Sequence, residues 1–105
     1  MSVVRLSPEA INELVEAAAW YRAQRPGLES ELLDEVERVL PLIETAPAAF
    51  PRLLDIPADL VVRRALLPRF PYALVFIDLG DYVEILAVAH TKRRPGYWLD
   101  RIAGR

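Results

Sequence analysis

The sequence predicts an α+β fold, with an N-terminal strand, a helical hairpin, a three-stranded antiparallel meander and a short C-terminal helix. Apolar residues recur with helical spacing between residues 8 and 43, and β-branched apolar stretches follow between residues 60 and 89. Proline and glycine separate these segments. A chain of 105 residues has room for one hydrophobic core, so we expect a single domain spanning residues 1–105.

The chain opens with a short β-branched stretch at residues 2–6, which is typical of an edge strand. Ser7 and Pro8 then predict an N-cap followed by proline at the first helical position. Pro26 and Gly27 end this first helix. Its core-facing residues are predicted to be Ile11, Leu14, Val15, Ala18 and Tyr21. Its solvent-facing residues are predicted to include Glu9, Glu13 and Glu16.

A second amphipathic helix follows directly, so the two helices form a hairpin that needs a surface to cover. Its predicted apolar face consists of Leu28, Leu32, Leu33, Val36, Val39, Leu40 and Ile43. Its predicted acidic face consists of Glu29, Glu31, Asp34, Glu35 and Glu37. Pro41 conflicts with this pattern, because a proline inside a helix removes a backbone hydrogen bond. We therefore expect a kink or an early end at Pro41.

Residues 44–60 have the composition of a loop, from which Phe50 is expected to reach the core. The three strands of the meander are predicted at residues 60–67, 72–79 and 82–89. Gly80 and Asp81 suit the tight turn between the last two strands. A short helix is expected at residues 97–102. The helical hairpin covers one face of this sheet, so the other face should be at least partly open and is the expected place of function.

Composition excludes several classes of protein. The hydrophobic fraction is 53%, yet no apolar run approaches the ~20 residues of a membrane span. The N-terminus lacks the basic start and long apolar run of a signal peptide. Cysteine is absent, which excludes disulfides and thiolate metal sites and fits a reducing compartment. We therefore expect a cytoplasmic protein without membrane association, cofactor or bound metal.

Charge is divided unevenly along the chain. The net charge is −2, but residues 1–62 carry five arginines and eleven acidic residues, whereas residues 63–105 carry eight basic and four acidic residues. The basic half suits an anionic partner such as nucleic acid or an acidic peptide. The alternative interpretation is a solvated surface on which basic residues cluster by chance.

The strongest functional signal lies after the last predicted strand. That strand ends on His90, the only histidine, and the residues that follow supply cations and a phenol: Lys92, Arg93, Arg94 and Tyr97. Arg64 is expected on the open sheet face together with Leu66, and Arg69 on a turn. Such groups can bind anions or stabilise charge on a phosphate, with His90 as general acid or base.

Each of these residues also has a structural interpretation. His90 can cap a loop through hydrogen bonds, Arg69 can simply be solvated, and Trp98 is expected to anchor the terminal segment. Because only one histidine is present, a mechanism that needs a histidine pair is excluded. No glycine-rich phosphate loop and no metal-spaced histidine or cysteine set is found.

The whole chain resembles the RelE/ParE superfamily of bacterial toxin–antitoxin toxins. The features that carry the resemblance are Ala19-Trp20-Tyr21, Pro26-Gly27-Leu28, Arg63-Arg64, the Phe70-Pro71-Tyr72 turn, and the stretch from Val83 to His90 with Arg93, Arg94, Pro95, Tyr97, Trp98 and Arg101. The resemblance implies a cytoplasmic toxin of a type II system, neutralised by a small antitoxin whose disordered segment folds on the toxin.

The superfamily contains two mechanisms. RelE-like members cleave mRNA on the ribosome, and ParE-like members poison DNA gyrase without being enzymes. RelE-like ribonucleases usually carry arginine directly after the tyrosine of the middle strand, whereas here Ala73 follows Tyr72, and Leu66 and Leu67 replace basic residues. The resemblance therefore favours the ParE-like branch and gyrase inhibition, with Arg64, Arg69, His90, Lys92, Arg93, Arg94 and Tyr97 as candidate target-binding residues.

Two alternatives stay open. In a ribosome-dependent mRNA endonuclease, Arg64, Lys92 and Arg94 would stabilise phosphate charge, and His90 or Tyr97 would transfer protons. In a non-toxic binding module, the chain would retain only its contact with the antitoxin.

Overall fold

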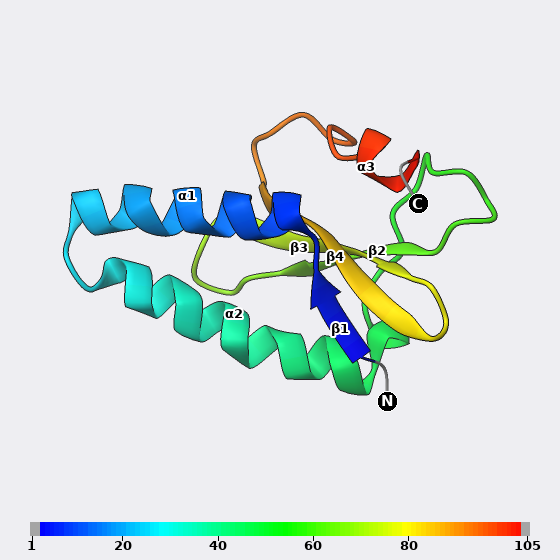
Figure 1. Cartoon of the computed structure of the whole chain (residues 1–105), viewed down its shortest axis with the longest axis horizontal. Helices are drawn as coiled ribbons and strands as arrows, with labels where there is room; N and C mark the ends of the chain where they lie inside the picture. The colour runs from blue at the N-terminus through cyan, green and yellow to red at the C-terminus, as the bar shows by residue number, and fades with distance from the viewer. Residues whose placement is uncertain (1–2, 104–105) are drawn as a thin grey trace.

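The computed structural model describes residues 3–103 (Figure 1). Its elements are β1 (Val3–Leu6), α1 (Pro8–Gln24), α2 (Leu28–Thr45), the 3-10 turn η1 (Pro47–Ala49), β2 (Val62–Leu66), β3 (Tyr72–Asp78), β4 (Tyr82–His90) and α3 (Asp100–Ala103). The sheet order is β1-β4-β3-β2, with β1 parallel to β4 and the other pairs antiparallel. The predicted α+β order and the edge position of β1 are confirmed.

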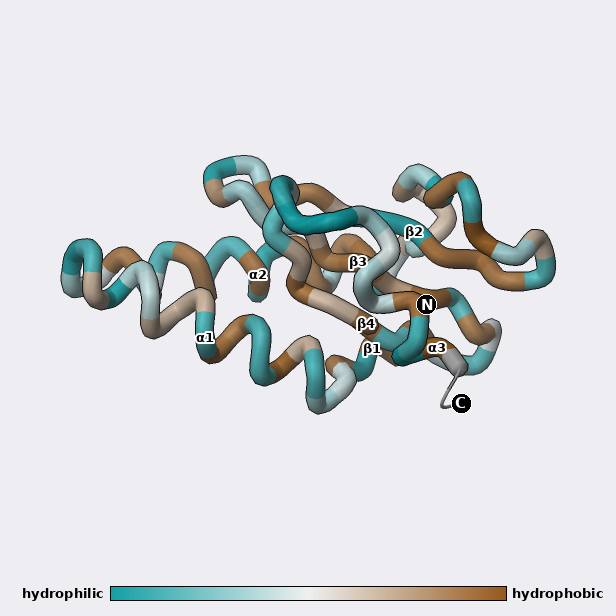
Figure 2. Tube along the Cα trace, turned by 90° about the horizontal axis from the view of Figure 1, so that it is seen from above, coloured by the Kyte–Doolittle hydropathy of each residue, from teal (hydrophilic) through white to brown (hydrophobic). Residues whose placement is uncertain are grey.

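Helices α1 and α2 lie side by side on one face of the sheet and extend beyond it (Figure 1). The main core lies between this hairpin and the sheet. Its fully buried members include Leu32 and Ile43 from α2 and Leu74, Phe76, Val83 and Ile85 from the sheet. Phe50 packs against Phe76 with 5.9 Å between ring centroids, as expected from the loop position of Phe50. Figure 2 shows hydrophobic residues concentrated on the central strands.

Helix α1 begins as predicted but faces the sheet differently. The Ser7 hydroxyl accepts a 3.1 Å hydrogen bond from the Ala10 amide, which is the expected N-cap. Ala10 and Ala17 are buried, whereas the predicted core residues Ile11 and Val15 are 47% and 61% exposed. Those two assignments were wrong, because backbone contacts of Ser7 with β4 fix how the helix is rotated and small alanines let it lie close to the sheet.

Helix α2 differs from the prediction in where it ends and in the burial of Glu35. It does not end at Pro41 but runs to Thr45. Ile43, which is fully buried, anchors the turn beyond the exposed Pro41, so packing offsets the missing backbone hydrogen bond. Glu35, predicted on the solvent face, is only 1% exposed, and its Oε1 accepts a 2.6 Å hydrogen bond from the Arg69 amide. This bond attaches α2 to the turn between β2 and β3.

Strand β4 contains a β-bulge that the sequence did not indicate. Val75 of β3 pairs with Ala87, but the next residue, Phe76, pairs with Ile85, so Leu86 is an additional residue on β4. As a result Leu86 and Ala87 both pack on the face away from the helices, and Val88 returns to the helical face. The bulge therefore reverses the alternation for the end of the strand.

The sheet face away from the helices is more covered than expected. A second core forms there from Val62, Val75, Ile77, Leu86, Ala87, Ala89 and Trp98. Leu53, Ile56 and Leu60 from the long loop pack against it, together with Tyr97 and Ile102. The expected anchoring by Trp98 is confirmed. Helix α3 starts at Asp100, later than residue 97, because the segment that precedes it forms turns from Gly96.

Candidate functional site

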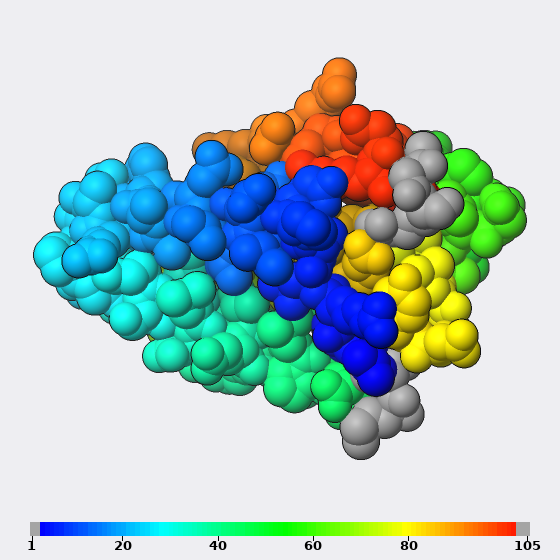
Figure 3. Space-filling view, viewed as in Figure 1, coloured from blue at the N-terminus to red at the C-terminus, as the bar shows by residue number. Residues whose placement is uncertain are grey.

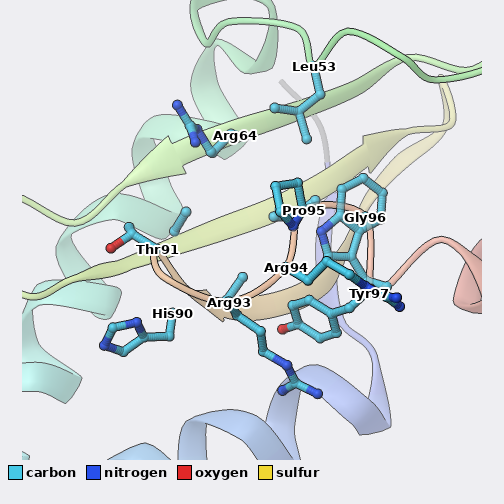
Figure 4. Close-up of a pocket in the computed structure, with 13 residues that line it drawn as sticks. Leu53, Arg64, His90, Thr91, Arg93, Arg94, Pro95, Gly96 and Tyr97 are labelled. Carbon is cyan, nitrogen blue, oxygen red and sulfur yellow. The ribbon is translucent and has the colours of Figure 1, made fainter.

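The candidate residues gather around a pocket of about 100 Å³ where β4 ends (Figure 4). Arg64 of β2 borders it on one side, and the loop from Thr91 to Tyr97 borders it on the other. Its floor is apolar, since Ala73, Val75 and Ala89 project from β3 and β4. The sheet thus brings Arg64 close to a loop that lies about thirty residues further along the chain.

Arg64 and Arg94 are two cations that line the pocket. Both are exposed, and within residues 3–103 no carboxylate lies at ion-pairing distance from either guanidinium group. Arg64 alternates with the buried Ala65, which places it on the face predicted from the strand pattern. Figure 4 shows the two side chains on different sides of the pocket. They are available to an anionic group of a partner.

His90 borders the pocket but its ring is directed elsewhere. Because the bulge reverses the alternation, His90 shares the helical face of the sheet with Tyr72, and the ring centroids lie 5.1 Å apart. Nδ1 of His90 accepts a 3.1 Å hydrogen bond from the Lys92 amide, which is the loop-capping role considered above. In Figure 4 the imidazole points away from Arg64. The imidazole and Arg64 therefore do not converge on one point.

Tyr97 is held by a network that the sequence did not indicate. Its hydroxyl donates a 2.7 Å hydrogen bond to Oε2 of Glu13 on α1. Arg101 donates from both terminal nitrogens to the same carboxylate, at 2.9 and 3.0 Å, and the Val88 amide donates to Oε1 at 3.0 Å. Glu13 was expected in solvent, so that assignment was wrong. Its spacing from Ala10 and Ala17, which puts all three on one helix face, was the available signal.

The network shifts the pKa values of its members. Burial raises the pKa of Glu13, but the hydrogen bonds from Arg101, Tyr97 and Val88 outweigh burial and leave the pKa below its usual value. Burial and the hydrogen bond to Glu13 raise the pKa of the Tyr97 phenol well above its usual value. The hydrogen bond to Glu13 also raises the pKa of Arg101. The phenol is thus held protonated as a donor to Glu13.

Arg93 belongs to this network, whereas Lys92 does not. The guanidinium group of Arg93 lies 3.8 Å from the centre of the Tyr97 ring and 3.6 Å from Oε2 of Glu13. Figure 4 shows Arg93 directed toward α1 and away from Arg64. Lys92 is exposed and lies outside the pocket lining. The segment that follows β4, drawn in orange in Figure 3, stands out from the surface above α1.

Arg69 lies apart from the other candidates. Its guanidinium group is 2.5 Å from Oε1 of Glu31 on α2, and Arg25 binds the other oxygen of the same carboxylate at 2.9 Å. The turn that carries Arg69 is attached to α2 through Glu35. Arg69 is therefore paired instead of simply solvated, and the fold does not bring it to the pocket.

The part of the chain that the structure describes contains neither a metal-ligand cluster nor a membrane-spanning helix. Between residues 3 and 103, no group of three or more histidine, aspartate or glutamate side chains is arranged to hold a metal ion. In the same range, no helix combines the length and the apolar character that crossing a membrane requires.

The fold and the basic segment after the last strand are those expected of the RelE/ParE superfamily. The family model described as "ParE toxin of type II toxin-antitoxin system, parDE" matches residues 4–95, and the chain belongs to this family. It is therefore a type II toxin, and the family implies an antitoxin partner.

The solved structures agree with the fold. A chain from the "Chromosomal ParDE TA system from P. aeruginosa" superposes with a TM-score of 0.72 at 24% sequence identity. The match covers 86% of the present chain and 96% of the other chain. At this identity the match supports the architecture alone. No curated protein sequence matches the chain.

Proposed function

We propose that this toxin binds and inhibits DNA gyrase in the cytoplasm, that it thereby arrests growth, and that a cognate antitoxin neutralises it. One observation carries the preference for gyrase over mRNA. The position where RelE-like ribonucleases usually carry an arginine is Ala73, and this residue is part of the apolar floor of the pocket, 3% exposed. Strand pairing places Ala73 between Leu66 and Ala89, so neither neighbour supplies a replacement cation.

The remaining ribonuclease candidates are not arranged for proton transfer at one phosphate. The Tyr97 hydroxyl is engaged by Glu13, and its pKa is raised by burial and by that hydrogen bond. His90 faces the opposite side of the sheet from Arg64. Charge on a transferring phosphate needs several positioned donors, and the loss of one donor commonly costs ~10²-fold in rate. The arrangement favours binding over catalysis.

The test is an assay of purified gyrase with purified toxin, which measures both supercoiling and trapped cleaved DNA. We expect loss of supercoiling at micromolar toxin and recovery when antitoxin is added in equimolar amount. Toxin already bound to its antitoxin is the control for contaminating nucleases. If gyrase retains full activity with a preparation that still arrests growth in cells, the proposal is wrong.

The mRNA endonuclease remains the second candidate, because Arg64 and Arg94 do border one pocket. Its test is primer extension on translating ribosomes with wild-type toxin and the double variant Arg94→Ala/His90→Ala. Cleavage by the wild type that the variant lacks would establish this alternative. A chain that neither inhibits gyrase, cleaves mRNA nor harms its host would be the non-toxic binding module.

A further inference from the structure

Two hollows on the sheet face away from the helices share a wall. The first is the pocket between Arg64 and the loop after β4. The second is a groove of about 300 Å³ between residues 53–56 and 95–99. Both are lined by Leu53, Pro95, Gly96 and Trp98. Figure 4 shows Leu53 directed toward Pro95 at this common wall. The two hollows therefore form one continuous surface, which we call the basic–apolar surface.

The groove presents apolar side chains to solvent. Leu54 is 84% exposed, the largest value for a large hydrophobic side chain within residues 3–103, and Leu99 on the opposite side is 38% exposed. The adjacent Asp55 has a φ of 60°, and it is the one non-glycine residue with positive φ in the same range. Aspartate is one of the few residues that adopt this left-handed conformation readily, and Asp55 lies in the bend that follows Leu53. Leu54 contributes little to stability, because most of its side chain stays in water.

The charged end of the surface is not neutralised from within the described chain. Arg64 and Arg94 have no carboxylate partner among residues 3–103. Glu13, the acidic side chain of the network, is engaged by Tyr97 and Arg101. The one carboxylate that lines either hollow is Asp55, in the groove. Two cations thus lie next to an exposed apolar groove.

We infer that the basic–apolar surface is where the toxin docks on its target, and that it binds a protein segment with a carboxylate beside a leucine-sized apolar side chain. Acidic side chains of the segment bind at Arg64 and at Arg94, which lie on different sides of the pocket, and the apolar side chain enters the groove against Leu54 and Leu99. The identity of the target as gyrase rests on the proposed function, whereas the position of the docking surface does not. Antitoxin binding is not assigned to this surface.

The chemistry of the surface favours protein over nucleic acid. A nucleic-acid backbone requires cations in series along its path. Here the surface continues from Arg64 and Arg94 to the apolar side chains of Leu54 and Leu99, without further cations in the groove lining. The chain as a whole is acidic, with a pI of 5.4. A protein interface instead combines an apolar centre with a polar rim, and arginine is enriched in it. The basic–apolar surface has both parts, since Arg64 lies at the pocket and the apolar side chains lie in the adjoining groove.

The experiment compares Leu54→Asp and Arg94→Glu with the control Leu42→Asp. Leu42 is 57% exposed and lies on α2, away from this surface, so it is a second exposed leucine of the same chemistry. Affinity for purified gyrase is measured for each variant, together with growth arrest in cells. Circular dichroism and thermal unfolding verify that each variant is folded. If Leu54→Asp does not fold, Leu54→Ser replaces it.

We expect Leu54→Asp and Arg94→Glu each to weaken gyrase binding at least tenfold and to lose growth arrest. Leu42→Asp should bind gyrase as the wild type does. All variants should keep a cooperative unfolding transition like that of the wild type, because each substitution is on the surface. Wild-type affinity of both Leu54→Asp and Arg94→Glu for gyrase overturns the inference and leaves the proposed function intact.

If the wild-type toxin does not bind gyrase, the proposed function fails and the surface is tested separately. A photo-reactive residue at position 54, with position 42 as control, is crosslinked in growth-arrested cells. A crosslink to a peptide with an acidic residue beside an apolar one, together with loss of arrest in Leu54→Asp, supports the surface. A crosslink to RNA, to DNA, to a second toxin copy or to a peptide without that pair overturns it, as does the absence of any crosslink.

Discussion

The hydroxyl group of Tyr97 donates a 2.7 Å hydrogen bond to Oε2 of Glu13, 84 positions earlier in the chain. Arg101 binds the same carboxylate with both terminal nitrogens and also donates to the Leu86 carbonyl at 2.8 Å. One side chain of α1 therefore attaches the C-terminal segment to the bulged part of β4. The loop that carries Arg94 is held at both of its ends, by β4 and by this network.

Replacing Glu13 tests whether the network holds the loop in place. We expect Glu13→Gln to lower the free energy of unfolding by about 2 kcal/mol, because two arginines and a phenol lose their charged acceptor. The exposed Glu16 on the same helix is the matched control, and Glu16→Gln should change stability by less than ~0.5 kcal/mol. Urea unfolding at neutral pH measures both. Equal effects of the two substitutions would show that the network is not stabilising.

The free energy of unfolding should also decrease at acid pH, because Glu13 becomes protonated there. Its pKa in the folded protein lies below the usual value of 4.5, since the hydrogen bonds outweigh burial. The unfolded chain then binds more protons than the folded one near that pH, so the contribution of Glu13 is complete above about pH 4.5 and is lost as pH falls through the lower folded pKa.

The measurement for this effect is the free energy of unfolding between pH 7 and pH 3. We expect a smaller decrease in Glu13→Gln than in the wild type. Part of the decrease should persist in the variant, because hydrogen bonds from Arg25 and Arg69 also lower the pKa of Glu31. Identical pH profiles for the variant and the wild type would contradict the assignment to Glu13.

Tyr97→Phe separates a structural role of the phenol from a chemical one. The substitution removes one hydrogen bond to Glu13 and keeps the ring under Arg93, so we expect a loss of about 1 kcal/mol in stability. Growth arrest should persist at a slightly higher expression level. If toxicity disappears while the protein stays folded and bound to its antitoxin, the phenol acts on the target directly and the endonuclease alternative gains support.

Glu35 offers a test of a buried carboxylate. Its Oε1 accepts from the Arg69 amide, while Oε2 has no hydrogen-bond partner within the described residues, and Arg38 lies 4.0 Å away. Glu35→Gln keeps an acceptor for the amide and removes the charge, so stability should change by less than ~1 kcal/mol. Glu35→Ala leaves the amide unpaired and should cost about 1–3 kcal/mol. The exposed Glu37→Ala is the control. A larger loss in Glu35→Gln than in Glu35→Ala would show that the charge itself is required.

Much of the fold follows from local patterns. Ser7 and Pro8 start α1 where predicted, and Gly27, with a φ of 97°, separates the two helices. The three strands of the meander lie within two residues of their predicted bounds. Arg64 projects to the sheet face that its strand position predicted. Each of these features depends on residues adjacent in sequence, and their conformational preferences are sufficient to specify them.

The candidate site follows from the sequence only in part. Arg64 and Arg94 both line one pocket, on different sides of it. His90 faces the other side because Leu86 is an additional residue in β4, and no local pattern marks that bulge. Arg69 pairs with Glu31, a contact between a turn and a helix 38 residues apart.

The sequence by itself determined the order of elements, the helix boundaries near Ser7 and Gly27, and the basic character of the segment after β4. The tertiary structure decided which charges are free to bind. The sequence does not distinguish Glu13 and Glu35 from glutamates that lie in solvent. In the fold, Glu13 accepts hydrogen bonds from Arg101, and Glu35 accepts one from the Arg69 amide. The physical reason is that burying a carboxylate is favourable only where donors from other parts of the chain converge on it, and only the packed fold brings those donors together.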